Sequence, residues 1–241
     1  MGMVEFELAV QDTHGLAVAA KIKPDRIELC SALQLGGLTP SLGLIETAVA
    51  TPGIPPVHVL IRPRAGGFAY AADDTALIMR DIVNVLKAGA CGLVMGGIQG
   101  GKVDKSLMEG AVEAAGDAEV TFHRAFDTVH DPEEAVETLA GLGVRRILAD
   151  ATDLETLARA VEAAAGRIEI MAGGGVRPHL VEKIVRTGVD AVHASAKHTV
   201  RDAVGITLGS SAPAGEQGRE TTDEHEAARI MSALRAAAAR R

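Results

Sequence analysis

Three ionisable residues, His123, Arg124 and Asp127, lie within the short segment VTFHRAFD at 120–127. Apolar and polar residues alternate before them, which is the period-2 pattern of a buried strand. Three such groups at one strand end are costly to order unless they are solvated or paired. Together they could hold an anion and transfer protons. The alternative is a strand that runs into a polar loop, with Asp127 starting a turn.

Other strand-like segments also end in polar side chains. We expect proton transfer from carboxylates and imidazoles, and we expect guanidinium groups to hold an anion. The proton-transfer candidates are Glu7, Glu28, His123 and Asp127, and the anion-binding candidates are Arg62, Arg64 and Arg124. An unpaired buried charge is costly, so the alternative is a structural ion-pair network beneath these strand ends.

The run AGGGV at 172–176 precedes an expected helix near 177–187. Glycines there would expose backbone N–H groups at a helix N-terminus, which suits an anion. Gly173, Gly174 and Gly175, together with Ser195, therefore predict a phosphate or carboxylate cradle.

The elements that must position these residues repeat one pattern. Gly89, Gly143 and Gly188 each stand at an expected helix C-cap, and an apolar strand follows each of them. Strands are expected near 5–10, 26–30, 57–62, 92–96, 119–124, 145–149, 167–171 and 190–194. Helices are expected near 14–22, 40–51, 73–88, 104–115, 132–141, 153–165, 177–187 and 223–238.

Eight strand–helix units in 241 residues have the size and rhythm of a closed (β/α)₈ TIM barrel. We therefore expect one domain over residues 1–241, and an open doubly wound sheet is the alternative. In a barrel, the polar strand ends would meet at one mouth. Residues 209–222 are small and polar and predict a flexible loop, and residues 223–238 predict a closing helix.

Composition narrows the classes of partner. Hydrophobic residues make up 47% of the chain but aromatic residues only 2%, so aliphatic side chains must build the core, as in helices layered on a parallel sheet. The net charge of −8 and the lack of a basic stripe argue against a nucleic-acid partner. The sequence has no signal peptide and no apolar run of about 18 residues, which argues against a membrane partner. Two cysteines fit a reducing cytoplasm, where we expect the protein to reside.

Residues that could bind a metal are scattered. Cys30, Cys91 and several histidines and methionines are present, but there is no CxxC or HxxxH motif. Cys30 by itself is typical of a small buried hydrophobic residue. No organic cofactor is indicated.

Four motifs, taken together, resemble the copper homeostasis protein CutC family. They are RIELCSALQLGGLTPSLG (26–43), IRPRAGGFAY (61–70), VTFHRAFD (120–127) and IMAGGGV (170–176), in the family's order. The resemblance extends from about residue 5 to about residue 198. It implies a (β/α)₈ barrel, a cytoplasmic location, copper binding and a homo-oligomer, most simply a dimer. It also places a Cu(I) ligand at Cys30, whereas Ala9 stands where the family often has a second cysteine.

Three functions follow. The resemblance implies a copper homeostasis protein whose partner is a copper ion. The polar strand ends instead favour an enzyme that acts on a small anionic metabolite, phosphorylated or carboxylated, by acid–base chemistry. The third alternative is a non-catalytic oligomeric scaffold with an ion-paired rim.

Overall fold

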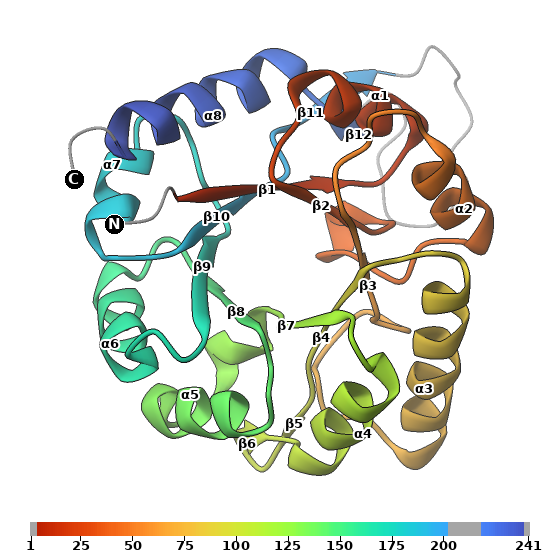
Figure 1. The fold of residues 1–241 in the computed structure, drawn as a ribbon, viewed down its shortest axis with the longest axis vertical. Helices are drawn as coiled ribbons and strands as arrows, with labels where there is room; N and C mark the ends of the chain where they lie inside the picture. Colours follow the sequence, from red (N-terminus) through yellow and green to blue (C-terminus); the bar gives the residue numbers. More distant parts are fainter. Residues whose placement is uncertain (1–3, 202–217, 239–241) are drawn as a thin grey trace.

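Eight parallel strands close into a barrel in the computed structural model, which describes residues 4–201 and 218–238 (Figure 1). The order around the barrel is β1-β10-β9-β8-β7-β4-β3-β2, so the first strand pairs with the last. The predicted (β/α)₈ barrel is confirmed. The strands are β1 (Glu5–Val10), β2 (Arg26–Leu29), β3 (Val57–Leu60), β4 (Gly92–Met95), β7 (Glu119–Phe122), β8 (Arg146–Asp150), β9 (Glu169–Gly173) and β10 (Ala191–Ala194).

Helices form a ring outside the strands (Figure 1). They are α1 (Thr13–Ile22), α2 (Leu42–Ala50), α3 (Ala72–Lys87), α4 (Lys105–Ala115), α5 (Pro132–Gly141), α6 (Leu154–Ala164), α7 (Val181–Arg186) and α8 (Glu224–Ala238). Two short 3₁₀ helices, η1 (Leu33–Leu35) and η2 (Arg124–Thr128), follow β2 and β7. None of the helices in the described ranges has the length and hydropathy needed to cross a bilayer.

The alternation of side chains divides the apolar residues into separate clusters. Residues such as Phe6 and Leu8 of β1 belong to the large core that strands and helices share. Two small clusters, Cys30–Leu60–Val94 and Leu148–Met171–Ala191, come from the opposite strand faces. Because successive strand residues point to opposite sides, the polar residues on these same faces point into the barrel.

Helix starts follow the sequence signals closely at α5 and less closely at α6. Asp131 caps α5 by accepting a hydrogen bond from the Glu134 backbone N–H at 3.0 Å. At α6 the cap is Asp153, which accepts from Thr156 N–H at 3.0 Å. Thr152, the residue before this cap, donates its hydroxyl to Asp150 at 2.8 Å.

Helix α7 begins at Val181, four residues later than expected, and is only six residues long. Pro178 explains the delay, because a proline disfavours helical backbone angles at the preceding residue. The glycine triplet therefore does not form the N-terminus of a helix, and that prediction was wrong. Gly174 and Gly175 adopt positive φ angles of 89° and 70° and form a turn instead.

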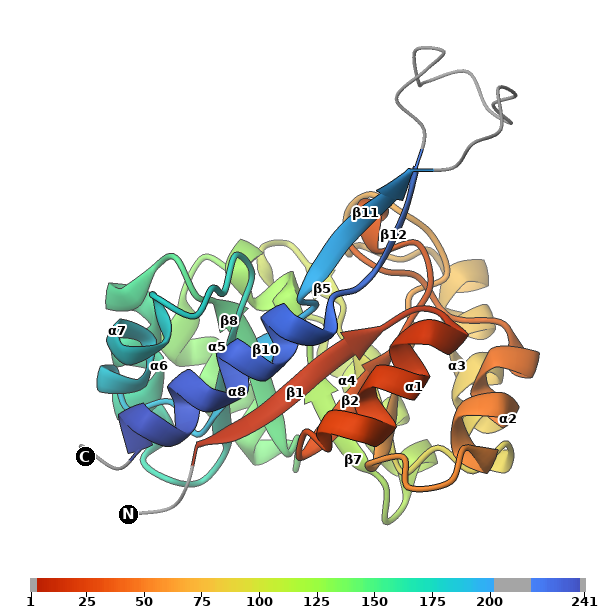
Figure 2. The same ribbon diagram turned by 90° about the horizontal axis from the view of Figure 1, so that it is seen from above.

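The segment after β10 forms a ribbon that projects from the barrel (Figure 2). Strand β11 (Lys197–Arg201) pairs antiparallel with β12 (Gly218–Thr222). Residues 218–222, expected to belong to a loop, are thus a strand, while 209–217 lie outside the described residues. The expected closing helix is confirmed as α8, which follows β12 directly.

Candidate functional site

A cavity of about 370 Å³ opens at the carboxyl end of the barrel strands, where the sequence places the candidate site. Side chains from the interior faces of the strands and from the loops after them line it. They are Glu28, Leu33, Gly36, Leu60, Arg62, Phe68, His123, Arg124, Asp127, Thr128, Leu148 and His193. Five of the predicted site residues therefore meet around one cavity.

At the cavity wall, Glu28 and His193 form a cluster with the buried Glu7. His193 Nδ1 lies 2.7 Å from Glu7 Oε1 and 3.6 Å from Glu28 Oε2. Glu7 accepts a hydrogen bond from Arg26 Nε at 2.7 Å. By contrast, Glu28 Oε2 is buried without a hydrogen-bond partner. Three ligand atoms of Glu7, Glu28 and His193 lie within 4.8 Å of one another, a spacing that could hold a metal ion.

The two carboxylates of this cluster differ in proton affinity. Burial and the nearby charge of Glu7 raise the pKa of Glu28 to about 7, although His193 acts in the opposite direction. Burial would also raise the pKa of Glu7, but the His193 hydrogen bond and the Arg26 charge hold it well below its usual range. Burial disfavours a charged His193, yet its bond to Glu7 and the charge of Glu28 raise its pKa. The cluster thus contains one firmly ionised carboxylate and one that titrates near neutrality.

His123 is neutral at physiological pH, because burial and the charge of Arg62 lower its pKa to about 3. Its Nδ1 accepts a hydrogen bond from Ala125 N–H at 3.2 Å. That bond requires the proton to reside on Nε2. Nε2 is buried and has no hydrogen-bond partner among the described residues. His123 therefore offers one unused N–H donor at the cavity wall.

Arg62 lies beside His123 and is held by backbone oxygens. Its Nη1 donates to Leu35 O at 2.9 Å and to Gly37 O at 2.8 Å, and its Nη2 donates to Gly66 O at 2.9 Å. Its guanidinium carbon lies 5.4 Å from the centre of the Phe68 ring. Within the described residues, no carboxylate forms an ion pair with Arg62, and its Nε is buried without a partner.

Arg124, at the rim, is fully paired. It donates to Asp127 at 2.7 Å and to Asp150 at 2.6 Å. Asp127 in turn accepts from Asp150 N–H at 2.8 Å, which fixes the loop that contains η2. The guanidinium packs against Gly174, where an added Cβ would lie 2.6 Å from Nη1. Arg124 and Asp127 therefore stabilise the rim through one another.

Five of the other predicted anion-binding residues do not line the cavity. Arg64 pairs with Asp74 at 2.9 Å and donates to backbone carbonyls of its own loop. Gly173 ends β9, Gly174 and Gly175 form the turn after it, and Ser195 follows β10 at a half-buried position. None of these residues contributes to the cavity wall.

Cys30, the residue that the resemblance assigns to copper, is completely buried. Its Sγ lies 3.7 Å from Val10 O, and its neighbours include Leu60 and Val94. Burial and the charge of Glu28 raise its pKa well above the usual value, so it remains a thiol. A protonated, enclosed thiol is poorly suited to coordinate a metal.

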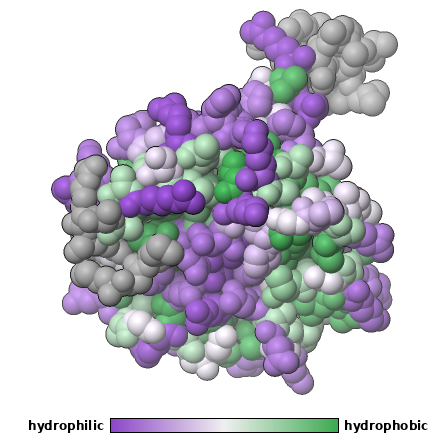
Figure 3. Space-filling model, turned by 45° about the horizontal axis from the view of Figure 1, so that its top comes forward, coloured by the Kyte–Doolittle hydropathy of each residue, from purple (hydrophilic) through white to green (hydrophobic). Residues whose placement is uncertain are grey.

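A second set of charges occupies the amino end of the barrel, over which hydrophilic residues gather in Figure 3. Arg146 pairs with Glu169 at 2.7 Å and with Glu119 at 3.1 Å, and it donates to Thr121 at 3.1 Å. Arg26 pairs with both Glu5 and Glu7. This ion-pair network lies at the end of the barrel opposite the cavity, whereas the sequence placed its alternative network beneath the carboxyl ends of the strands.

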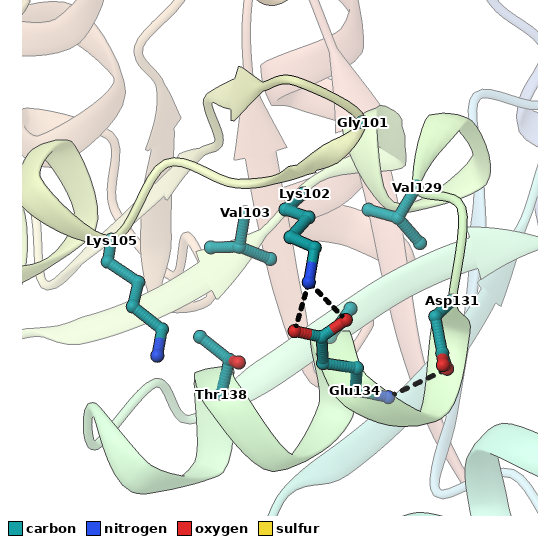
Figure 4. A pocket seen from close by; sticks show the side chains of 9 residues that line it. Gly101, Lys102, Val103, Lys105, Val129, Asp131, Glu134 and Thr138 are labelled. Atoms are coloured by element: carbon teal, nitrogen blue, oxygen red, sulfur yellow. Dashed lines mark hydrogen bonds and ion pairs between the residues drawn. The ribbon is translucent and has the colours of Figure 1, made fainter.

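A further pocket of about 280 Å³ lies between β6 (Lys102–Val103) and α5 (Figure 4). Lys102 Nζ contacts both Glu134 oxygens, at 2.7 and 2.9 Å, and Asp131 caps the helix. Because these groups satisfy one another, the pocket offers little to a ligand.

Sequence reasoning missed Phe68, and it counted His193 among the possible metal ligands without assigning it to the site. The pairing of β10 with β1 places His193 opposite Glu7, and this register depends on barrel closure. Phe68 lies in an irregular loop with no periodic pattern. A signal was present for His193, since it shares a strand face with Ser195.

The chain matches the CutC family over residues 4–198. A CutC family protein from Agrobacterium fabrum is 43% identical over 198 residues, which cover 79% of this chain and 78% of that protein. The human copper homeostasis protein cutC homolog is 37% identical over 232 residues, covering 90% of this chain and 84% of that protein. A crystal structure of CutC from Streptococcus agalactiae has a TM-score of 0.75 at 31% identity, covering 80% of this chain and 99% of that one. With the fold and these matches together, the chain belongs to the CutC family.

Proposed function

We propose that this protein takes part in copper homeostasis by binding a copper ion at Glu7, Glu28 and His193. The observation that carries the proposal is the buried Glu28 Oε2, which has no hydrogen-bond partner although it lies 3.6 Å from His193 Nδ1. An unsatisfied buried carboxylate oxygen is costly, and a cation between the three ligands would satisfy it.

The donor set favours the divalent ion. Carboxylate oxygens and an imidazole nitrogen suit Cu(II), whereas Cu(I) prefers thiolates and thioethers. Cys30 remains a buried thiol, and Ala9 supplies no second one. Arg26, bonded to Glu7, would orient that ligand from behind, as outer hydrogen bonds do in metal sites.

Titration of the metal-stripped protein with Cu(II), followed by electron paramagnetic resonance, tests the proposal. We expect one bound Cu(II) with a single nitrogen ligand. Glu28→Gln keeps the side-chain shape and removes the charge, so affinity should fall by at least about tenfold. Cys30→Ser is the matched control and should bind Cu(II) like the wild type. Binding that is lost in Cys30→Ser and retained in Glu28→Gln would refute the proposed ligands.

We also propose a cytoplasmic homodimer. The two free cysteines suit a reducing compartment. Exposed apolar side chains on adjacent α2 and α3 support an interface, namely Leu42, Val49, Leu77 and Val83. Analytical ultracentrifugation should show twice the chain mass, and a monomer at micromolar concentration would contradict the dimer.

A further inference from the structure

The mouth cavity contains groups that the copper site does not use. His123 Nε2 and Arg62 Nε are both buried without a hydrogen-bond partner among the residues described. Both side chains contact Phe68: the His123 and Phe68 ring centres lie 4.8 Å apart, and Arg62 Cζ lies 5.4 Å from the Phe68 centre. A neutral donor and a guanidinium thus lie around one aromatic ring.

The positive charge of Arg62 is not neutralised locally. Its partners are the backbone oxygens of Leu35, Gly37 and Gly66, which orient the guanidinium but bring no negative charge. A buried charge is tolerated when it is paired, and an acid bound in the cavity would provide the pair.

The remaining surroundings favour a carboxylate over a phosphate. Arg124 and Arg64 are already paired with aspartates, so Arg62 is the one arginine without a carboxylate partner among the described residues that line the cavity, which matches a monoanion. The glycine turn at 173–175 lies outside the cavity wall and supplies no N–H groups to it. Leu33, Leu60 and Leu148 line the same cavity and would contact an apolar portion.

We propose that the mouth cavity binds a small monocarboxylate, with the carboxylate against His123 and Arg62 and its apolar part against the three leucines. The volume of about 370 Å³ is at the small end for ligand pockets. The evidence for this carboxylate site comes from the cavity and does not depend on the proposed copper site. Because Glu28 and His193 line the same cavity, ligand and ion would occupy neighbouring positions.

Calorimetry with metal-stripped protein in EDTA tests the proposal. The probes are acetate, butyrate and benzoate, with butyramide as the uncharged match for butyrate and inorganic phosphate as the competing anion. We expect saturable binding of butyrate or benzoate that exceeds that of both butyramide and phosphate. Absence of saturable binding by any carboxylate, or equal binding of butyrate and butyramide, would overturn the proposal. Tighter binding of phosphate would overturn it as well.

Two arginines of one loop give a matched pair of variants. Arg62→Gln should weaken carboxylate binding by about tenfold or more, because it removes the charge-assisted contact. Arg64→Gln should change it by less than about twofold, since Arg64 does not line the cavity. Equal effects of the two substitutions would refute the assigned position of the carboxylate.

Arg62 also holds three backbone oxygens, so its variant could unfold the loop; wild-type nuclear magnetic resonance provides a second test. The His123 Nε2 proton should shift on addition of the bound carboxylate, and an unchanged signal at saturation would overturn the contact. Copper titration of the same protein after removal of EDTA separates the two proposals, because a failure to bind carboxylate in EDTA leaves the copper result unaffected.

Discussion

Buried charged side chains have different partners at the two ends of the barrel. At the amino end, Arg26 and Arg146 each contact two carboxylates. At the mouth, Arg62 donates its hydrogen bonds to backbone oxygens, and Glu28 Oε2 has no hydrogen-bond partner among the described residues. Glu7 connects the two regions, since it bonds to Arg26 on one side and to His193 on the other.

This difference distinguishes charged residues that stabilise the fold from charged residues that are available to bind a ligand. Paired buried charges fix one arrangement of strands, and the amino face of such barrels usually serves stability. Unpaired buried groups lower stability, so packing does not explain their presence. At the amino end, Arg146 Nε and His58 Nδ1 also lack hydrogen bonds within the described part of the chain, but both side chains lie beside Glu119. Arg62 has no such carboxylate among the described residues, so the mouth is the end at which a ligand would supply the missing partner.

The largest effect on stability should come from removing a buried ion pair at the amino end of the barrel. Arg146 has 2% of its side chain exposed, so Arg146→Met leaves Glu169 and Glu119 without their buried partner. We expect a loss of about 4 kcal/mol in the free energy of unfolding, measured in urea.

The neighbouring Arg145→Gln provides the control. Arg145 contacts the same two carboxylates, but 56% of its side chain is exposed. Its loss should cost less than about 1 kcal/mol. Similar losses of unfolding free energy for both variants would show that burial of the arginine does not determine how much its ion pairs contribute to stability.

The next effect concerns Glu28 at the unpaired end. Burial raises the pKa of Glu28 from 4.5 to about 7, so the folded protein holds this proton more tightly than the unfolded chain. The stabilising contribution is therefore complete below pH 4.5 and is lost as the pH rises through about 7. Glu28→Gln should exceed the wild type in stability by about 3 kcal/mol above that range.

Urea unfolding of both proteins across this pH range, without metal, measures the difference. The gap between the two curves should open as the pH rises. A constant gap would mean that Glu28 is ionised throughout, as a paired carboxylate would be.

A smaller effect distinguishes the two histidines of the mouth. Burial lowers the pKa of His123 to about 3, whereas the partners of His193 raise its pKa despite burial. Resonances of the His123 ring should therefore remain constant from about pH 8 to about pH 5, while His193 should take up its proton at a higher pH than an ordinary histidine. Protonation of His123 near its ordinary pKa would contradict the burial of its ring.

The smallest effect is expected at the rim. Arg124 is 42% exposed, and its ion pairs with Asp127 and Asp150 face solvent. Arg124→Gln should cost less than about 1 kcal/mol in urea unfolding. A loss of unfolding free energy as large as that of Arg146→Met would show that the rim ion pairs stabilise the fold as much as the network at the amino end does.

The barrel could be predicted because its signals are local. Glycines at helix ends and alternating strands mark each unit, and Asp131 with Pro132 marks the start of α5. Side-chain alternation also placed Glu28, Arg62 and His123 on interior faces. Five residues of the expected anion site lie away from the cavity wall, because their positions depend on backbone geometry such as the turn at 174–175.

Pairing between distant residues could not be predicted. The contact of His193 with Glu7 requires the register of the closing strands, and the isolation of Arg62 requires the path of the loop with Gly36 and Phe68. Burial of Cys30 follows from Leu60 and Val94 on neighbouring strands. These features decide charge state and donor availability, so the chemistry of the site depends on them.

The most direct test of the account is the position of copper in a crystal of this protein grown with Cu(II). Anomalous scattering measured at the copper absorption edge should give its strongest peak among Glu7, Glu28 and His193, at the unpaired end of the barrel. A strongest peak at Cys30 Sγ, or among the carboxylates of the amino end, would contradict the account.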